Sequence, residues 1–228
     1  MHVSPNPALD TASFVRFLLD SGALRFGSFT AKSGRQTPYF LDAGRFGSGM
    51  QIDRLGEFYA ERLQAGLPGG FDVLFGPAYK GIPLAVATAS ALARRGQDVG
   101  FCFNRKEAKD HGEGGVLVGH RLADGDRVVI IEDVTTAGTS VRETVPILRA
   151  AAKVRVVGLI VAVDRQERGQ DERGALRALA EEYELTPLSI VTIEQIVAEL
   201  RAANAGPSLL TAELEQAIAE YRSKYGAR

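Results

Sequence analysis

The chain has 228 residues, 45% of them hydrophobic and 24% charged, which is the composition of an ordinary soluble globular protein. Its formal net charge of −1 provides no overall field that would attract nucleic acid or an anionic membrane, so we expect neither as a partner. The start of the chain has no apolar signal region and no run approaches the ~18 apolar residues of a membrane span, so we expect a cytoplasmic protein. The single cysteine, Cys102, lies in an apolar run and excludes an intrachain disulfide.

The first fifty residues show one short helix pattern and several short strand patterns, and no long apolar segment that would form a layer of a core. Asp10 or Thr11 can cap a helix that ends at Gly22. Residues 24–46 are punctuated by glycine and hold β-branched or aromatic residues only in patches, which is typical of small strands. We therefore predict a small N-terminal hood, built from about residues 1–50 together with the C-terminal segment.

Beyond the hood, strand and helix patterns alternate. The predicted strands are 72–75, 99–103, 127–133, 154–163 and 188–191, with a hairpin at 116–122. The predicted helices are 52–66, 82–95, 139–152, 173–183, a segment capped by Thr192 and Gln195 that runs to Ala203, and one over 210–221. Pro146 should kink the helix that contains it or shorten its regular part. This alternation predicts an α/β fold, a doubly wound parallel sheet in a single domain over residues 1–228.

The most informative stretch is residues 128–140, where an apolar run ends at Glu132 and Asp133 and a small, hydroxyl-rich loop follows. Four β-branched residues in succession indicate a strand that is buried on both faces of a parallel sheet. Residues 135–140 offer amide N–H groups, hydroxyls and a flexible glycine just before a helix, and this combination suits a phosphate group. The two carboxylates suit sugar hydroxyls or a hydrated cation, so the pattern indicates a phosphorylated sugar.

Other interpretations of this stretch stay open from the residues alone. It could be an ordinary strand–turn–helix with acids at the solvated strand end. Nucleotide-binding motifs fit poorly, because the chain lacks a Gly-rich loop that ends in Gly-Lys-Ser/Thr and lacks Gly-x-Gly-x-x-Gly between a strand and a helix. The loops after Phe75, Phe103 and Asp133 should all face the crevice at the carboxyl ends of the strands.

The stretch 128–140 is similar to the signature by which type I phosphoribosyltransferases hold 5-phosphoribosyl 1-diphosphate (PRPP). Three further segments resemble orotate phosphoribosyltransferases: a mobile catalytic loop at 105–115, a diphosphate loop at 75–81 and a base-binding segment at 29–40. With residues 164–169, the resemblance covers roughly residues 10–225. It implies the type I phosphoribosyltransferase fold and transfer of a phosphoribosyl group from PRPP to orotate in pyrimidine synthesis.

The resemblance also implies roles for individual residues. The PRPP-binding residues would be Lys32, Tyr79, Lys80, Arg105, Lys106, Lys109, His111, Glu132, Asp133, Val134, Thr135, Thr136, Ala137, Gly138, Thr139 and Ser140. The orotate-binding residues would be Phe40, Leu41, Thr136 and Arg165, with Leu41 standing where relatives have a second aromatic residue. The catalytic residues would be Lys109, Asp133 and Lys32. Mg²⁺ would be held mainly by PRPP and water, because the chain has no cluster of metal ligands at suitable spacing.

In the family, the 105–115 loop reaches the neighbouring subunit's site, which implies a homodimer. Two alternatives remain at this point. A purine-type phosphoribosyltransferase would have no need for a carboxylate partner such as Arg165. A PRPP-sensing regulator would need a nucleic-acid-binding surface, which a net charge of −1 does not favour.

Overall fold

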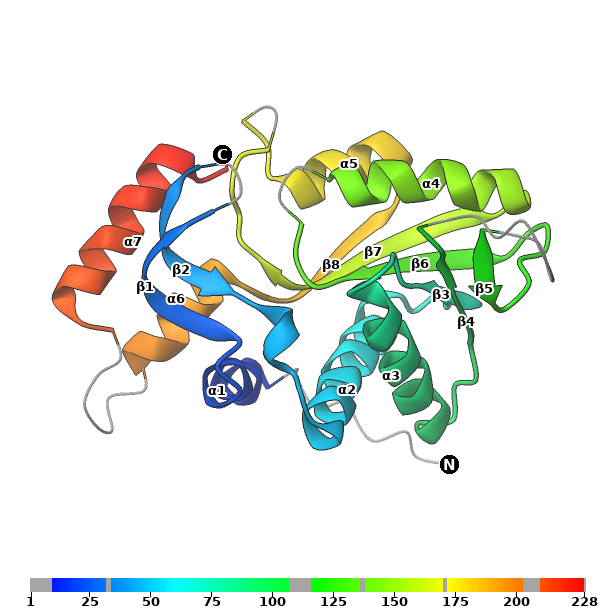
Figure 1. Ribbon diagram of the computed structural model, residues 1–228, viewed down its shortest axis with the longest axis horizontal. Helices are drawn as coiled ribbons and strands as arrows, with labels where there is room; N and C mark the ends of the chain where they lie inside the picture. Colours follow the sequence, from blue (N-terminus) through cyan, green and yellow to red (C-terminus); the bar gives the residue numbers. More distant parts are fainter. Residues whose placement is uncertain are drawn as a thin grey trace.

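The computed structural model describes residues 10–31, 34–106, 116–135, 138–169, 172–202 and 210–227. Its main feature there is a six-stranded sheet in the order β5-β4-β3-β6-β7-β8 (Figure 1). The strands are β3 (Val73–Phe75), β4 (Gly100–Asn104), β5 (Leu117–Gly119), β6 (Arg127–Glu132), β7 (Arg155–Asp164) and β8 (Thr186–Thr192). All neighbouring pairs are parallel except the edge pair β4–β5, so the predicted parallel sheet is confirmed. The hairpin predicted within residues 116–122 is wrong, because the single strand β5 in this segment pairs with β4 instead.

Helices cover both faces of this sheet. Figure 1 shows α2 (Gly49–Gly66) and α3 (Gly81–Arg94) on one face, and α4 (Thr139–Ala151) and α5 (Ala175–Tyr183) on the other. Alternate residues of β6 enter different cores: Val129 and Ile131 pack on the α2 side, and Val128 and Ile130 pack on the α4 side. Because both sets are fully buried, the strand needs apolar residues at successive positions, which explains its unbroken β-branched run.

The hood lies at the end of the sheet toward which the carboxyl ends of the strands point (Figure 1). Strands β1 (Leu24–Thr30) and β2 (Gln36–Leu41) form an antiparallel pair, followed by a 3₁₀ turn (Ala43–Arg45). Helix α7 (Ala212–Tyr225) packs on β2, and α1 (Thr11–Asp20) packs on α6 (Ile193–Ala202). The two ends of the chain thus contribute together to this part of the molecule.

The helix ends follow the predicted local chemistry. The Asp10 side chain accepts a hydrogen bond from the Ser13 amide at 3.0 Å at the start of α1. At the start of α6, the Gln195 amide donates to the Thr192 hydroxyl and the Thr192 amide donates to the Gln195 side chain, at 3.2 and 2.8 Å. The capping box is therefore confirmed.

Of the two effects expected of Pro146, the shortening of the helix is not found. Helix α4 runs unbroken through Pro146 to Ala151, so the helix is not shortened. Proline removes one backbone hydrogen bond, but Val141, Val145 and Leu148 are buried on the same helix. Packing of that face against the sheet holds the helix together, as tertiary contacts do for most helices.

Cys102 is fully buried in β4, and burial raises the pKa of its thiol to about 12, so the thiol stays protonated. No helix within the described ranges has both the length and the apolar content that a membrane span requires.

Candidate active site at the carboxyl ends of the strands

The carboxyl end of β6 places two acids in a largely buried position. Glu132 is 8% exposed and Asp133 is 7% exposed. Tyr59 of α2 donates its hydroxyl to the Glu132 carbonyl at 2.7 Å, and the Ala162 amide donates to the Asp133 carbonyl at 3.0 Å. The Asp133 carboxylate accepts from the Val134 amide at 2.9 Å. These bonds fix the turn from which both carboxyl groups project.

Glu132 is held in an environment that disfavours its charge. Burial raises its pKa to about 7, and the neighbouring charge of Asp133 acts in the same direction. The Ser140 hydroxyl, which donates to the Glu132 carboxylate, and the nearby Lys80 lower the pKa but do not outweigh burial. At neutral pH this group is therefore balanced between its protonated and ionised forms.

Lys80 links the end of β3 to the end of β6. Its Nζ atom lies 2.9 Å from an Asp133 carboxylate oxygen, and its side chain remains 58% exposed. Partial burial lowers the pKa of Lys80, but the hydrogen bond and charge of Asp133 outweigh this and the pKa is raised. Lys80 is thus a cation that an anionic ligand can reach. A cavity of about 390 Å³ adjoins it, lined in part by Phe46 and Pro83.

The loop before Lys80 is tightly folded. A Cβ atom on Gly76 would lie 2.1 Å from the Gly81 carbonyl oxygen, so only glycine fits this close approach. The Ala78 amide donates to the Asn104 side chain at 3.0 Å, which ties the loop to the end of β4. Lys106 lies 5.1 Å above the ring of Tyr79, and Tyr79 is 68% exposed. The first residues of the 105–115 segment therefore meet the loop after β3.

The start of α4 has the form of a phosphate-binding turn. Gly138 adopts a left-handed conformation with φ of 72°, and Thr139 and Ser140 form the first turn of the helix. A helix N-terminus with free amide groups and hydroxyls favours an anion. Since Ser140 also contacts Glu132, this turn and the two acids belong to one site.

Arg165, directly after β7, is held by a buried cluster. Its guanidinium lies 2.7 Å from the Glu167 carboxylate, and the two side chains are 14% and 10% exposed. Tyr39 of β2 donates its hydroxyl to the same carboxylate at 3.0 Å, and the guanidinium lies 5.5 Å from the Tyr39 ring centroid. Within the described residues, the Nε atom of Arg165 is buried without a hydrogen-bond partner. The cluster joins the sheet to the hood and fixes the plane of the guanidinium.

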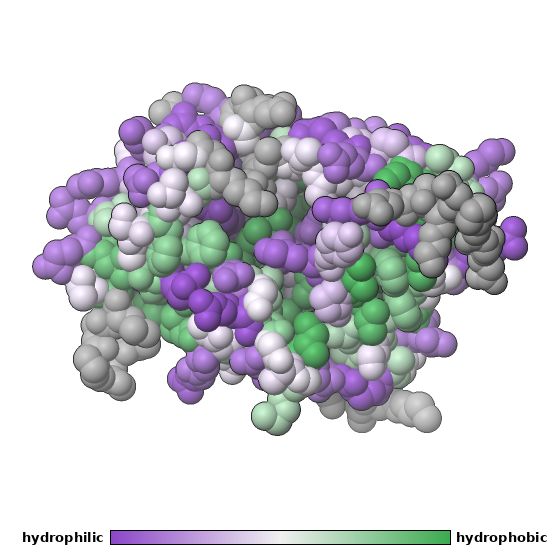
Figure 2. Space-filling model, viewed as in Figure 1, coloured by the Kyte–Doolittle hydropathy of each residue, from purple (hydrophilic) through white to green (hydrophobic). Residues whose placement is uncertain are grey.

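Phe40 and Leu41 lie next to this cluster in sequence but point to different faces of β2. The Phe40 ring lies 5.5 Å from the Phe29 ring and 5.6 Å from the Arg25 guanidinium. Because successive strand residues alternate, Leu41 shares the face of Tyr39 and packs against the core. Hydrophobic and hydrophilic residues meet along this boundary between hood and sheet (Figure 2).

Comparison with known proteins agrees with this arrangement. The phosphoribosyl transferase domain family matches residues 45–188. Orotate phosphoribosyltransferases from Lachnoclostridium phytofermentans and Bifidobacterium adolescentis are 50% and 49% identical, over 93% and 94% of this chain and 96% of each relative. The crystal structure of orotate phosphoribosyltransferase from Francisella tularensis matches with a TM-score of 0.81 at 33% identity, over 94% of this chain and 100% of that one.

The chain belongs to the orotate phosphoribosyltransferase family. Of the family residues expected in the sequence, the structure brings Lys80, Glu132, Asp133 and the start of α4 together at one edge of the sheet. Five expected site residues lie outside the described residues: Lys32, Lys109, His111, Thr136 and Ala137.

Three residues that support this orotate phosphoribosyltransferase site were missed in the sequence. Tyr59 lies 73 residues from Glu132 and Asn104 lies 26 residues from Ala78, so no local pattern joins either pair. Glu167 follows Arg165 by two residues in a segment already singled out. Its proximity to an isolated buried arginine could have suggested the ion pair.

Proposed function

We propose that this chain transfers the 5-phosphoribosyl group of PRPP to orotate and yields orotidine 5-monophosphate and diphosphate. The observation that carries the proposal is the 2.9 Å contact between Lys80 and Asp133, beside the start of α4. Lys80 is a cation that suits diphosphate, Asp133 is an acid that suits ribose hydroxyls, and the start of α4 suits a 5-phosphate. PRPP carries its ribose between a diphosphate and a 5-phosphate, so its groups match these three positions.

The reaction separates diphosphate from the anomeric carbon, so positive charge develops on the ribose ring as it does in glycoside cleavage. Glu132 and Asp133 would bind the 2- and 3-hydroxyls and stabilise that charge. Residues 135–140 would hold the 5-phosphate, and Val134 would lie against PRPP just before them. Lys80, with Tyr79, would hold the departing diphosphate, and binding of PRPP would draw the Lys80 ammonium away from Asp133.

Residues 105–115 would close over the reaction and exclude water, which would otherwise trap the cationic ring. Arg105, Lys106, Lys109 and His111 would contact the diphosphate from this segment. We propose that the segment serves the neighbouring subunit of a homodimer. Lys32 would lie near the same reacting groups.

Orotate would be recognised by its carboxylate and its ring. Arg165 would pair with the carboxylate, because a planar guanidinium matches a planar anion. Phe40 would stack on the ring and Thr136 would bond its edge, whereas Leu41, on the other face of β2, would back this wall from the core side. Glu167 already neutralises Arg165, so the orotate carboxylate would share the guanidinium rather than meet an uncompensated charge.

The described residues contain no group of three or more His, Cys, Asp or Glu side chains arranged to hold a metal ion. Mg²⁺ would be carried mainly by the oxygens of PRPP and by water. Bound Mg²⁺ would supply further positive charge to the diphosphate.

Base selectivity tests the proposal. The purified protein is incubated with PRPP and Mg²⁺ and with orotate, uracil or hypoxanthine in turn, and base consumption is followed by ultraviolet absorbance. We expect orotate to be the one base that is consumed. Addition of a chelator should stop this consumption. Preferential consumption of hypoxanthine would assign a purine-type transfer, and no consumption of any base would overturn the activity.

A further inference from the structure

Residues 165–168, which we call the arginine segment, follow β7 with an uncommon backbone conformation. Gln166 has a φ of 50°, in the left-handed region that residues other than glycine seldom adopt. Such a conformation costs free energy and persists only where several contacts fix it. One of them is local, because the Gln166 amide donates to the Asp164 carboxylate at 2.8 Å. Arg165 directly precedes Gln166, so the contacts that fix Gln166 also set the direction of the Arg165 side chain.

The chain just after α7 supplies backbone contacts to the arginine segment. Residues 225–227, which we call the tail, run antiparallel to it and form a β-bridge with it. The Arg168 amide donates to the Tyr225 carbonyl, and the Ala227 amide donates to the Gln166 carbonyl, each at 2.8 Å. Figure 1 shows the end of the chain beside the loop that follows β7. The tail therefore holds the strained residue from both directions of the backbone.

Helix α7 also reaches the arginine segment through side chains. Arg222 donates to the Glu194 carboxylate of α6, and the Gln166 side chain donates to the same carboxylate at 3.2 Å. The Glu194 amide in turn donates to the Gln166 side chain at 3.3 Å. Separately, the Tyr221 ring packs edge-on against Tyr39, with 5.7 Å between ring centroids, and Tyr39 lies beside the Arg165 guanidinium. Helix α7 thus contacts both the backbone and the surroundings of this arginine.

A second ion pair joins the same two helices without reaching the arginine segment. Arg201 of α6 donates to Glu215 of α7 at 2.6 Å. Within the described residues, neither of these side chains has a hydrogen bond to the arginine segment. The pair of Arg222 and Glu194 differs because its carboxylate also accepts from Gln166. The two pairs therefore separate packing of α6 on α7 from control of the arginine segment.

We propose that the tail and Arg222 position Arg165 for the carboxylate of orotate. This inference rests on the proposed function, and it assigns a positioning role to groups that act through Arg165. A guanidinium that pairs with a planar anion depends on orientation, and a small displacement of a positioned group weakens binding strongly. A looser arginine segment should therefore weaken binding of orotate. The residues proposed to bind PRPP at β6 and α4 are held by other contacts, so PRPP binding should be retained.

The variant Arg222→Gln/Ala227→Pro loosens the arginine segment from outside. It removes the ion pair with α6 and the amide that donates to Gln166. Gly226 has an extended conformation, with φ of −65° and ψ of 144°, which a following proline accepts. The matched control is Arg201→Gln/Ala227→Ser. It also removes one ion pair between α6 and α7, but it keeps the backbone amide of residue 227.

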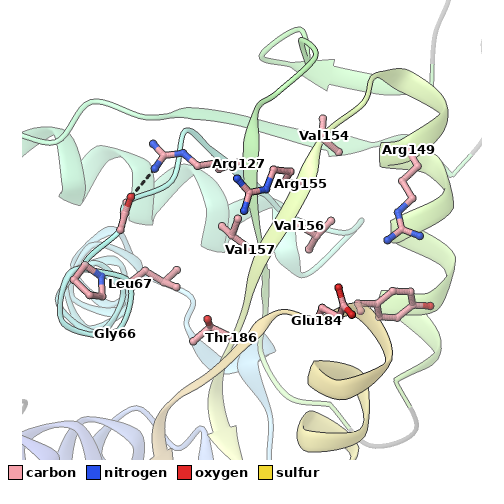
Figure 3. Close-up of a pocket in the computed structure, with 14 residues that line it drawn as sticks. Gly66, Leu67, Arg127, Arg149, Val154, Arg155, Val156, Val157, Glu184 and Thr186 are labelled. Atoms are coloured by element: carbon pink, nitrogen blue, oxygen red, sulfur yellow. Dashed lines mark hydrogen bonds between the residues drawn. The ribbon is translucent and has the colours of Figure 1, made fainter.

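A further variant controls for a general loss of stability. At the other end of the sheet, Arg127 binds Asp72 at 2.7 Å and the Gly69 carbonyl at 2.5 Å, beside a cavity of about 670 Å³ that Leu67 also lines (Figure 3). Strand β7 has ten residues, so this end lies about 30 Å from the arginine segment. Asp72→Asn removes the ion pair there and should lower Tm without changing recognition of the base.

Initial rates give KM for orotate and KM for PRPP in each variant. In Arg222→Gln/Ala227→Pro we expect the orotate KM to rise at least about fivefold, with the PRPP KM within about twofold of the wild-type value. Both values should stay unchanged in the matched control and in Asp72→Asn. An unchanged orotate KM, an equal rise of the PRPP KM, or the same rise in either control would overturn the positioning role.

Amide hydrogen exchange, followed by mass spectrometry, separates this inference from the proposed function because it needs no substrate. Exchange in a peptide that spans the arginine segment should be at least about tenfold faster in Arg222→Gln/Ala227→Pro than in the wild type and both controls. If the wild type consumed no orotate, the proposed function would fail, and the exchange rates would still decide whether the tail holds this segment. Equal exchange in all four proteins would overturn the inference itself.

Discussion

The buried pair of Arg165 and Glu167 allows a quantitative test of how the base-binding side of the site is built. Both side chains are at most 14% exposed, so neither charge is well solvated without the other. Replacing Glu167 by Gln keeps the shape and an acceptor for Tyr39 but leaves the guanidinium uncompensated. Loss of one partner of a buried ion pair costs about 3–5 kcal/mol. For a chain of this length, a loss of about 3 kcal/mol lowers Tm by roughly 6–12 °C.

The assay is a double-mutant cycle with Arg165→Met, Glu167→Gln and the combined variant, measured by urea unfolding at one protomer concentration. Each single change should destabilise the protein strongly, and the combined change should cost about 1–3 kcal/mol less than the sum of the two. The exposed pair of Arg177 and Glu181 on α5 provides the control, with no measurable coupling. Additive costs at Arg165 and Glu167 would refute the coupling that the geometry implies.

Three further predictions concern the acids and the loop. Folding raises the pKa of Glu132 from 4.5 to about 7, so the folded wild type loses stability as this group ionises. Between pH 4.5 and pH 7 the unfolding free energy of the wild type should fall by about 3 kcal/mol. The variant Glu132→Gln cannot ionise at this position and should not show this fall. If the unfolding free energies of wild type and variant, measured in urea, changed in parallel with pH, the pKa shift would be contradicted. Tyr59→Phe should lower the unfolding free energy by about 1–2 kcal/mol, because it removes the buried hydrogen bond to the Glu132 carbonyl. Tyr79→Phe, at an exposed position, should leave the unfolding free energy unchanged. Mixing inactive Lys109→Ala with inactive Asp133→Asn should restore about a quarter of wild-type activity if subunits of an isologous dimer share sites, and no recovery after proven subunit exchange would exclude sharing.

Much of the fold follows from local chemistry that is legible in the sequence. The run from Val128 to Ile131 requires burial on both faces, and the alternation of strands and helices then implies a parallel sheet. Gly138 marks the left-handed turn before α4, and Thr192 with Gln195 marks the start of α6. These signals depend on residues that are close together in the chain.

The remaining features depend on contacts between distant segments. The pairing of Arg165 with Glu167 is fixed by Tyr39 of the hood, which lies 128 residues from Glu167. Pro146 carries a local signal for a shortened helix, yet packing of α4 keeps the helix at full length. The late start of β8 beside β7, at the pair Gly158 and Thr186, follows from strand register and has no local sequence signal.

The most direct measurement of the proposed reaction follows orotate absorbance after PRPP and Mg²⁺ are added to the wild type and to Asp133→Asn at equal concentration. We predict rapid loss of orotate with the wild type. Asp133→Asn should react at least about a hundredfold more slowly, because it weakens stabilisation of the cationic ring. Equal rates would contradict placing the reaction at the carboxyl end of β6, and unchanged orotate with the wild type would contradict the proposed function itself.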